Sequence, residues 1–177
     1  MRRLSASAAA VTALVALAAA AWAQHGGGGA GAAGHQAAQA CQAEFEQVVG
    51  EGRGFGLAFA ADQNGYPGPM HVLELKERLT LSPEQEASAR ALMHAMFAAS
   101  RPASGRLLEA EAKLRRLFAG GSADETSVRA AVGEVERLRG EVRLVHLLTH
   151  LKTRALLSEA QRRLYHEARW GVLPPPR

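Results

Sequence analysis

The chain has 177 residues, enough for one modest domain with appendages. Alanine, leucine, glutamate and arginine are abundant and aromatic residues make up only 5%, which indicates an all-helical protein. The formal net charge is +4, of which Arg2 and Arg3 at the N-terminus supply two, leaving +2. The remaining arginines alternate with glutamates instead of clustering on one face, so the composition argues against nucleic acid as a partner.

Residues 1–23 have the pattern of a secretory signal peptide. Arg2 and Arg3 form a positive start, residues 11–21 form an apolar run, and Ala21-Trp22-Ala23 is a small-residue cleavage site. We expect export to the periplasm with cleavage after Ala23. The alternative is an uncleaved anchor, because the apolar run is about long enough to span a bilayer.

Residues 24–52 form a second segment, rich in glycine and alanine and carrying His25 and His35. Its composition predicts a flexible arm, either a plain linker or a weak metal-binding tract, with a short helix near residues 41–49. A turn cluster, Asn-Gly-Tyr-Pro-Gly-Pro at 64–69, lies near the start of the folded domain, which we place at 53–170. Residues 171–177 form a proline-rich tail.

A short helix is predicted over residues 70–79, followed by a long one. Ser82 is a typical N-cap with Pro83 in the first helical position, and Gln85 completes a capping box. The helix should run to a stop at residues 120–121, with Pro102 bending or breaking it near Ser100.

A second long helix should begin at another capping box, formed by Ser122 and Glu125, and a short last helix should begin at Ser158. Apolar residues at alternating spacings of three and four give the second long helix a narrow packing seam. The predicted fold is therefore all-α, a long antiparallel helical hairpin with a short helix at each end. So thin a core needs a partner, and we expect a homodimer. The seam consists of Val128, Val135, Leu138, Val142, Val145 and Thr149.

Two histidines stand out in the second long helix. His146 and His150 are four residues apart, so both imidazoles project from one helical face. They are either ligands for a transition metal or partly exposed residues of a helix packed for other reasons. The flanking leucines make the segment apolar on nearly every side, so that the rest of the domain or a second subunit should cover it.

The two helix starts, Leu-Ser-Pro-Glu-Gln at 81–85 and Leu-Ser-Glu-Ala-Gln at 157–161, resemble the repeated LTxxQ motif of the Spy/CpxP family of exported stress proteins. The histidine-bearing segment 144–150 resembles the periplasmic heavy-metal sensors of that superfamily, whose nickel and cobalt members carry His-x-x-x-Met at the place of His146 and His150. The turn cluster and the segment from His71 onward resemble the same sensors. The resemblance covers residues 53–165.

The resemblance also implies further metal ligands. The sensors carry His-x-x-x-His in the first short helix, where this chain has His71 with Leu75 four residues on; Glu74 is a substitute oxygen ligand. Their ligating glutamate falls near Met93, beside His94. The implied site is His71, Glu74, His94, His146 and His150, with nickel, cobalt, zinc or copper as the metal. For His94 the alternative is a hydrogen-bonded histidine at the edge of the core.

Two functions follow from the residues and the resemblance together. In the first, the exported protein binds transition-metal ions and senses or buffers them in heavy-metal or envelope stress, with a membrane-bound signalling protein as a partner. In the second, it is an ATP-independent periplasmic chaperone that holds unfolded client proteins. We expect no enzymatic activity, because no nucleophile, acid or base is embedded in a catalytic pattern.

Overall fold

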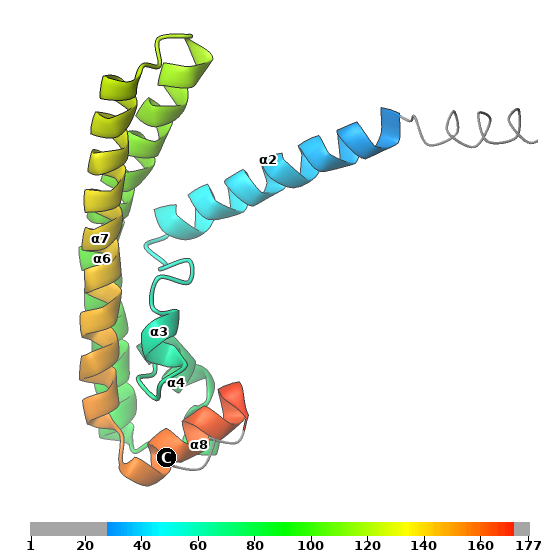
Figure 1. Cartoon of the computed structure of the whole chain (residues 1–177). Coiled ribbons are helices and arrows are strands. Elements are labelled where there is room, and N and C mark those ends of the chain that lie inside the picture. Colours follow the sequence, from blue (N-terminus) through cyan, green and yellow to red (C-terminus); the bar gives the residue numbers. More distant parts are fainter. Residues whose placement is uncertain (1–27, 172–177) are drawn as a thin grey trace, which may run out of the picture. The chain divides into compact units, whose positions relative to one another are not determined.

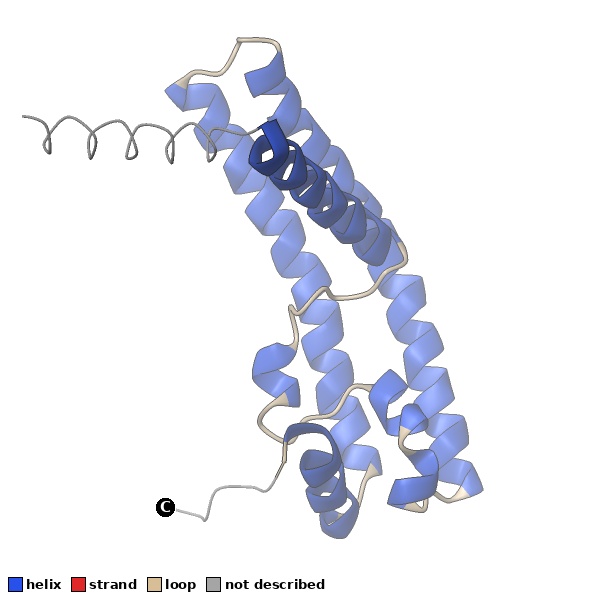
Figure 2. Ribbon diagram, turned by 90° about the vertical axis from the view of Figure 1, so that its right-hand side faces the viewer, coloured by secondary structure: helices blue, strands red, loops and turns tan. Residues whose placement is uncertain are grey.

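The computed structural model describes residues 28–171, so the expected leader (1–23) and residues 172–177 of the expected tail lie outside the described part. Within residues 28–171 all regular secondary structure is helical, which confirms the predicted class (Figure 2). None of the helices in this range combines the length and apolar character needed to cross a membrane. The helices are α2 (Gly28–Gly50), α3 (Phe59–Asp62), α4 (Pro69–Glu74), α5 (Lys76–Leu79), α6 (Pro83–Ala119), α7 (Glu125–Leu156) and α8 (Glu159–Trp170).

The predicted hairpin is present as α6 and α7, which lie side by side and antiparallel (Figure 1). The short helices α3, α4 and α8 gather at the end of the hairpin away from its connecting turn. The chain divides between Ala43 and Glu44 into two units, and the hairpin with its short helices belongs to the second. The pocket described below also belongs to the second unit.

The segment predicted as an arm contains more helix than predicted. Residues 24–27 lie outside the described part, and the short helix expected near residues 41–49 is present as the end of a longer helix that begins at Gly28. Alanine has the highest helix propensity, which offsets the glycines of this segment. Val49, near the end of α2, is buried against the hairpin.

Helix α6 begins and ends as predicted, from Pro83 to Ala119. Ser82 accepts a hydrogen bond from the Gln85 backbone, and the Gln85 side chain accepts one from the Ser82 backbone. Of the two predicted effects of Pro102, bending or breaking, a break near Ser100 is wrong, since Pro102 lies inside one continuous helix. A proline in a helix interior costs about 3 kcal/mol, which the packing of α6 along α7 outweighs here.

Helix α7 begins two residues later than the sequence indicates. Asp124, not Ser122, is the N-cap, and it forms a capping box with Ser127. An aspartate and a serine are both good N-caps, so local sequence alone did not decide between two overlapping boxes. Four of the six predicted seam residues are buried, namely Val135, Leu138, Val142 and Thr149, and Val128 and Val145 are half-buried.

The two capping boxes of the sequence motif meet in space. Gln85 and Gln161 exchange side-chain amide hydrogen bonds of 2.9 and 3.0 Å. The same amides donate to the carbonyl oxygens of Leu156 and Leu79, at 2.8 and 3.2 Å. Each glutamine thus caps its own helix and ties it to the other motif.

Two buried apolar clusters hold the unit together, one along the hairpin and one at its base. On α6 the second cluster ends at Ala89 and the first begins at Ala103. On α7 the first cluster ends at Val142, and the second begins at Leu157, directly after the helix. The interval between the clusters contains His146 and His150. The first cluster comprises Val49, Ala103, Leu107, Val135, Leu138 and Val142; the second comprises Val72, Leu79, Ala89, Leu157 and Tyr165.

Candidate metal centre

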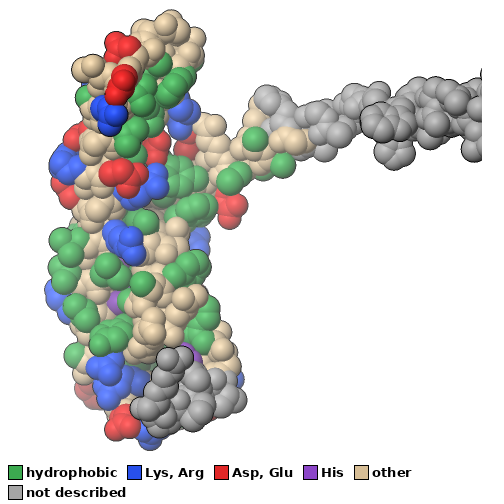
Figure 3. Space-filling model, in the orientation of Figure 1, with side chains coloured by type: hydrophobic (Ala, Val, Ile, Leu, Met, Phe, Trp, Pro, Cys, Tyr) green, Lys and Arg blue, Asp and Glu red, His purple; other side chains and the backbone are tan. Residues whose placement is uncertain are grey.

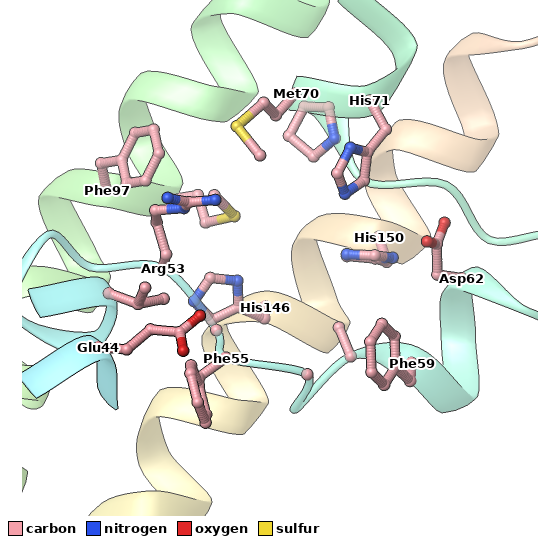
Figure 4. A pocket seen from close by; sticks show the side chains of 17 residues that line it. Glu44, Arg53, Phe55, Phe59, Asp62, Met70, His71, Phe97, His146 and His150 are labelled. Carbon is pink, nitrogen blue, oxygen red and sulfur yellow. The ribbon is translucent and has the colours of Figure 1, made fainter. Parts of the chain in front are cut away.

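A pocket of about 420 Å³ occupies the interval between the two clusters. His71 of α4 and His146 and His150 of α7 line it (Figure 4). The rest of the lining is largely apolar, with Phe55 and Phe59 among the lining side chains. Three of the five residues expected at a metal site therefore meet at one cavity, although they come from two distant parts of the sequence.

His150 is held with one ring nitrogen engaged. Its Nδ1 lies 2.6 Å from the carbonyl oxygen of Tyr66, and because a carbonyl only accepts, Nδ1 carries the proton. Burial lowers the pKa of His150, although the Tyr66 hydrogen bond and the charge of Asp62 oppose that shift. The neutral ring then has its lone pair on Nε2. Metal-ligating histidines typically donate the other ring N–H to a carbonyl or carboxylate in this way.

His71 shows the same arrangement with a carboxylate. Its Nδ1 lies 3.0 Å from Oε2 of Glu74, one turn along α4. Its Nε2 lies 3.0 Å from Nη2 of Arg169 on α8. Glu74 does not line the pocket, so it lies behind the His71 ring, where it can orient the imidazole.

His146 is the most enclosed of the three, with 4% of its surface exposed. Its Nε2 lies 3.3 Å from the hydroxyl oxygen of Ser100, which is fully buried on α6. Burial lowers the pKa of His146, the neighbouring His150 adds to the effect, and a backbone hydrogen bond with Gly52 opposes it. Both α7 histidines are therefore held toward the neutral form that can ligate a metal.

Two glycines, one in the segment before α3 and one directly before α4, let the backbone approach these rings. A Cβ at Gly68 would lie 2.9 Å from Nε2 of His150, and one at Gly54 would lie 3.1 Å from Nδ1 of His146. The loop can therefore lie this close to the His150 ring only because residue 68 has no side chain. Beside Gly54, Phe55 adopts a left-handed φ of 38°, a strained conformation for a bulky residue.

The histidines do not form a finished metal cage. Among residues 28–171, no three of the His, Cys, Asp and Glu side chains gather closely enough to hold an ion. His94 is exposed and does not line the pocket. Its spacing from Ala87, Ala91 and Ala98 puts all four residues on one helical stripe, which favoured an inward position, but the three alanines are exposed as well. Alanine fits either face of a helix, so such a stripe carries little information on direction.

Sequence reasoning missed the groups that position the rings, namely the Tyr66 carbonyl, Ser100 and Arg169. A backbone carbonyl leaves no trace in the side-chain pattern, and Ser100 is one of several serines in α6. The dense turn at residues 64–69 was a usable signal, because a loop rich in glycine and proline can approach a helix closely.

The fold and the pocket define an all-helical hairpin protein with a histidine-lined cavity at its base. The family model described as heavy-metal resistance matches residues 52–163, more than half of the chain, and the chain belongs to this family. The resemblance to Spy/CpxP-like metal-resistance proteins is thereby confirmed. Neither the curated proteins nor the solved structures gave a match.

Proposed function

We propose that this member of the heavy-metal resistance family is an exported protein that binds a transition-metal ion through His71, His146 and His150. The observation that carries the proposal is the orientation of two rings at one pocket. His71 and His150 each engage Nδ1 with an oxygen acceptor, Glu74 in one case and the Tyr66 carbonyl in the other. That arrangement places the ligating lone pair on Nε2 in both.

The donor set decides the class of metal. Imidazole nitrogens suit nickel, cobalt, zinc and copper, whereas calcium and magnesium require oxygen ligands. In this role Glu74 is a positioning group for His71 rather than the ligand implied by the resemblance. His94, exposed on α6, takes no part in the proposed site.

Metal binding through these residues would join α4 to α7. His71 lies on α4, and the other two histidines lie on α7. A metal that binds only the arrangement in which the rings converge stabilises that arrangement at the expense of others. A membrane-bound signalling protein could recognise such a change in conformation, which supports a sensing role. A protein that only buffers metal ions would need the metal affinity but no conformational change. Export to the periplasm is supported by the leader pattern of residues 1–23.

Isothermal titration of the protein with nickel, cobalt, zinc and copper tests the proposal. We expect the tight binding to be lost in the double variant His146→Ala/His150→Ala and strongly weakened in His71→Ala. His94→Ala is the matched control on α6, and a His25→Ala/His35→Ala variant measures any binding by the N-terminal segment. If the double variant binds like the parent, the proposed site is wrong.

A second function, that of an ATP-independent chaperone for unfolded clients, is favoured by exposed apolar side chains on the unit. Hydrophobic and charged side chains of both signs intermingle on the face seen in Figure 3. Suppression of client aggregation that persists in the His146→Ala/His150→Ala variant would favour this role. The large hydrophobic residues exposed in the described part include Phe55, Phe59, Phe118, Val132, Leu144, Leu148, Leu151 and Leu164.

A further inference from the structure

One contact at the pocket runs against metal binding. Arg169, at the end of α8, brings Nη2 to 3.0 Å from Nε2 of His71. A guanidinium only donates hydrogen bonds, so Nε2 of His71 must accept. The proton of the neutral ring is then on Nδ1, where it is donated to Glu74. The Arg169 guanidinium therefore occupies the lone pair that a metal ion would use.

Arg169 is held in this position by a buried acid. Its Nε lies 2.9 Å from Oδ2 of Asp62, whose side chain is 4% exposed. The other carboxylate oxygen, Oδ1, accepts a hydrogen bond from the buried hydroxyl of Tyr165. Asp62 thus links two residues of α8 to α3, and Arg169 extends the link to His71 on α4.

We propose that the Arg169 guanidinium competes with a metal ion for Nε2 of His71, so that metal binding to His71 and the Arg169–His71 hydrogen bond exclude each other. The proposal rests on the proposed function, because it concerns the same histidine. It deepens that function by naming a regulatory residue outside the ligand set. Since Arg169 belongs to α8, metal binding is coupled to the last turn of that helix.

The coupling is reciprocal, as linkage requires. A metal that takes Nε2 of His71 frees one guanidinium nitrogen of Arg169, while the Asp62 ion pair can keep the side chain near its place. Conversely, anything that pulls Arg169 away from His71 raises the affinity for metal. Arg169 is therefore a positioning residue, and its effect is measurable from both ends.

Metal titration of Arg169→Gln gives the first test. Loss of one competing hydrogen bond should raise the affinity for zinc or nickel about two- to tenfold. Removing the positive charge of Arg169 also favours the binding of any cation nearby. The same substitution is therefore made in the His71→Ala variant, where the gain in metal affinity should disappear. Arg163→Gln, an exposed arginine of α8 paired only with its helix neighbour Glu159 in the described contacts, is the matched charge control.

A second measurement keeps Arg169 in place and so does not depend on whether the Arg169→Gln variant folds. The Arg169 guanidinium lies 5.6 Å from the centre of the Trp170 ring, which also packs edge-on against Phe59 at 6.3 Å. In a Trp22→Phe background Trp170 is the sole tryptophan. We expect zinc, which has no redox chemistry of its own, to change Trp170 fluorescence with the same midpoint as binding, and His71→Ala to abolish the change.

The outcomes separate the two proposals. The competition is overturned if Arg169→Gln does not change the affinity and metal binding leaves Trp170 fluorescence unchanged. If binding is still tight and still needs His146 and His150, the proposed function stands. An equal gain in affinity with and without His71 also overturns it, because the effect is then one of charge alone. A parent that binds no metal overturns both.

Discussion

At the scale of single residues, the proposed site depends on burial that keeps His146 and His150 neutral and on hydrogen bonds that orient the His71 and His150 rings. The pKa values of His146 and His150 are lowered from 6.5, chiefly by burial. Asp62 raises the pKa of His150, whereas His71 and Arg169 lower it. Both rings therefore stay neutral to lower pH in the folded protein than in the unfolded chain.

This difference predicts how stability depends on pH. Above the ordinary pKa of 6.5, folded and unfolded chains are both neutral at these positions. As the pH falls below it, the unfolded chain takes up protons first, so the free energy of unfolding decreases by at most about 1.4 kcal/mol per pH unit for each histidine. Urea unfolding of the metal-free protein between about pH 7 and pH 5 measures the slope. A slope equal to that of His146→Gln/His150→Gln would contradict the assignment.

Gly68 gives a second prediction at this scale. Its backbone conformation, with φ −80° and ψ 150°, is open to any residue, so the effect of a substitution is steric. In Gly68→Ala the new methyl group would lie 2.9 Å from Nε2 of His150. We expect a loss of metal affinity of at least tenfold, measured by zinc titration. Gly133→Ala, in open space on α7, is the control and should leave the affinity unchanged.

At the scale of helices, the N-caps are the features most directly visible in the sequence. Ser82→Ala and Ser158→Ala should each lower the free energy of unfolding by about 1 kcal/mol, because each removes the side-chain acceptor of a capping box. Ser122 and Asp124 provide a sharper comparison. Asp124→Ala should cost about as much as the serine variants, and Ser122→Ala should cost little. If Ser122→Ala lowered the denaturant midpoint more than Asp124→Ala, Ser122 would be the N-cap, as the sequence first indicated.

The sequence predicted the long helices and the starts of α6 and α8 because these features depend on neighbouring residues. It located the hairpin, the motifs around Gln85 and Gln161, and the α7 histidines. A break at Pro102 was wrong, because contacts with another helix offset the local penalty of the proline. The inward position of His94 was also wrong, because the neighbouring alanines fit a buried or an exposed helix face equally well. The hydrogen bond between His71 and Arg169 joins residues 98 positions apart and has no local signature.

At the scale of the whole molecule, one apolar stripe lacks cover within the described part of the chain. Leu144, Leu148 and Leu151 recur at helical spacing on α7 and are 55%, 46% and 52% exposed. The sequence led us to expect cover for this segment from the domain or from a second subunit, and the described unit does not supply it. Because burial of such leucines contributes about 25 cal/mol per Å² of apolar surface, we expect a second copy of the chain to cover them.

This expectation of a homodimer is tested by substitution on the stripe. Leu148→Asp should convert the dimer to a monomer in analytical ultracentrifugation at micromolar concentration, with helix content unchanged. Val132→Asp, at an equally exposed position nearer the start of α7, is the control and should remain dimeric. If the parent chain sediments as a monomer, the prediction of a homodimer is wrong.

The most direct test of the central claim, that the pocket histidines hold a metal ion, is X-ray absorption spectroscopy of the zinc-loaded protein. We predict an imidazole-rich first shell with zinc–nitrogen distances of about 2.0–2.1 Å. The imidazole scattering should decrease when His71 or His150 is replaced by alanine and stay unchanged in His94→Ala. A spectrum without imidazole scattering, or one that none of the pocket substitutions alters, would contradict the account.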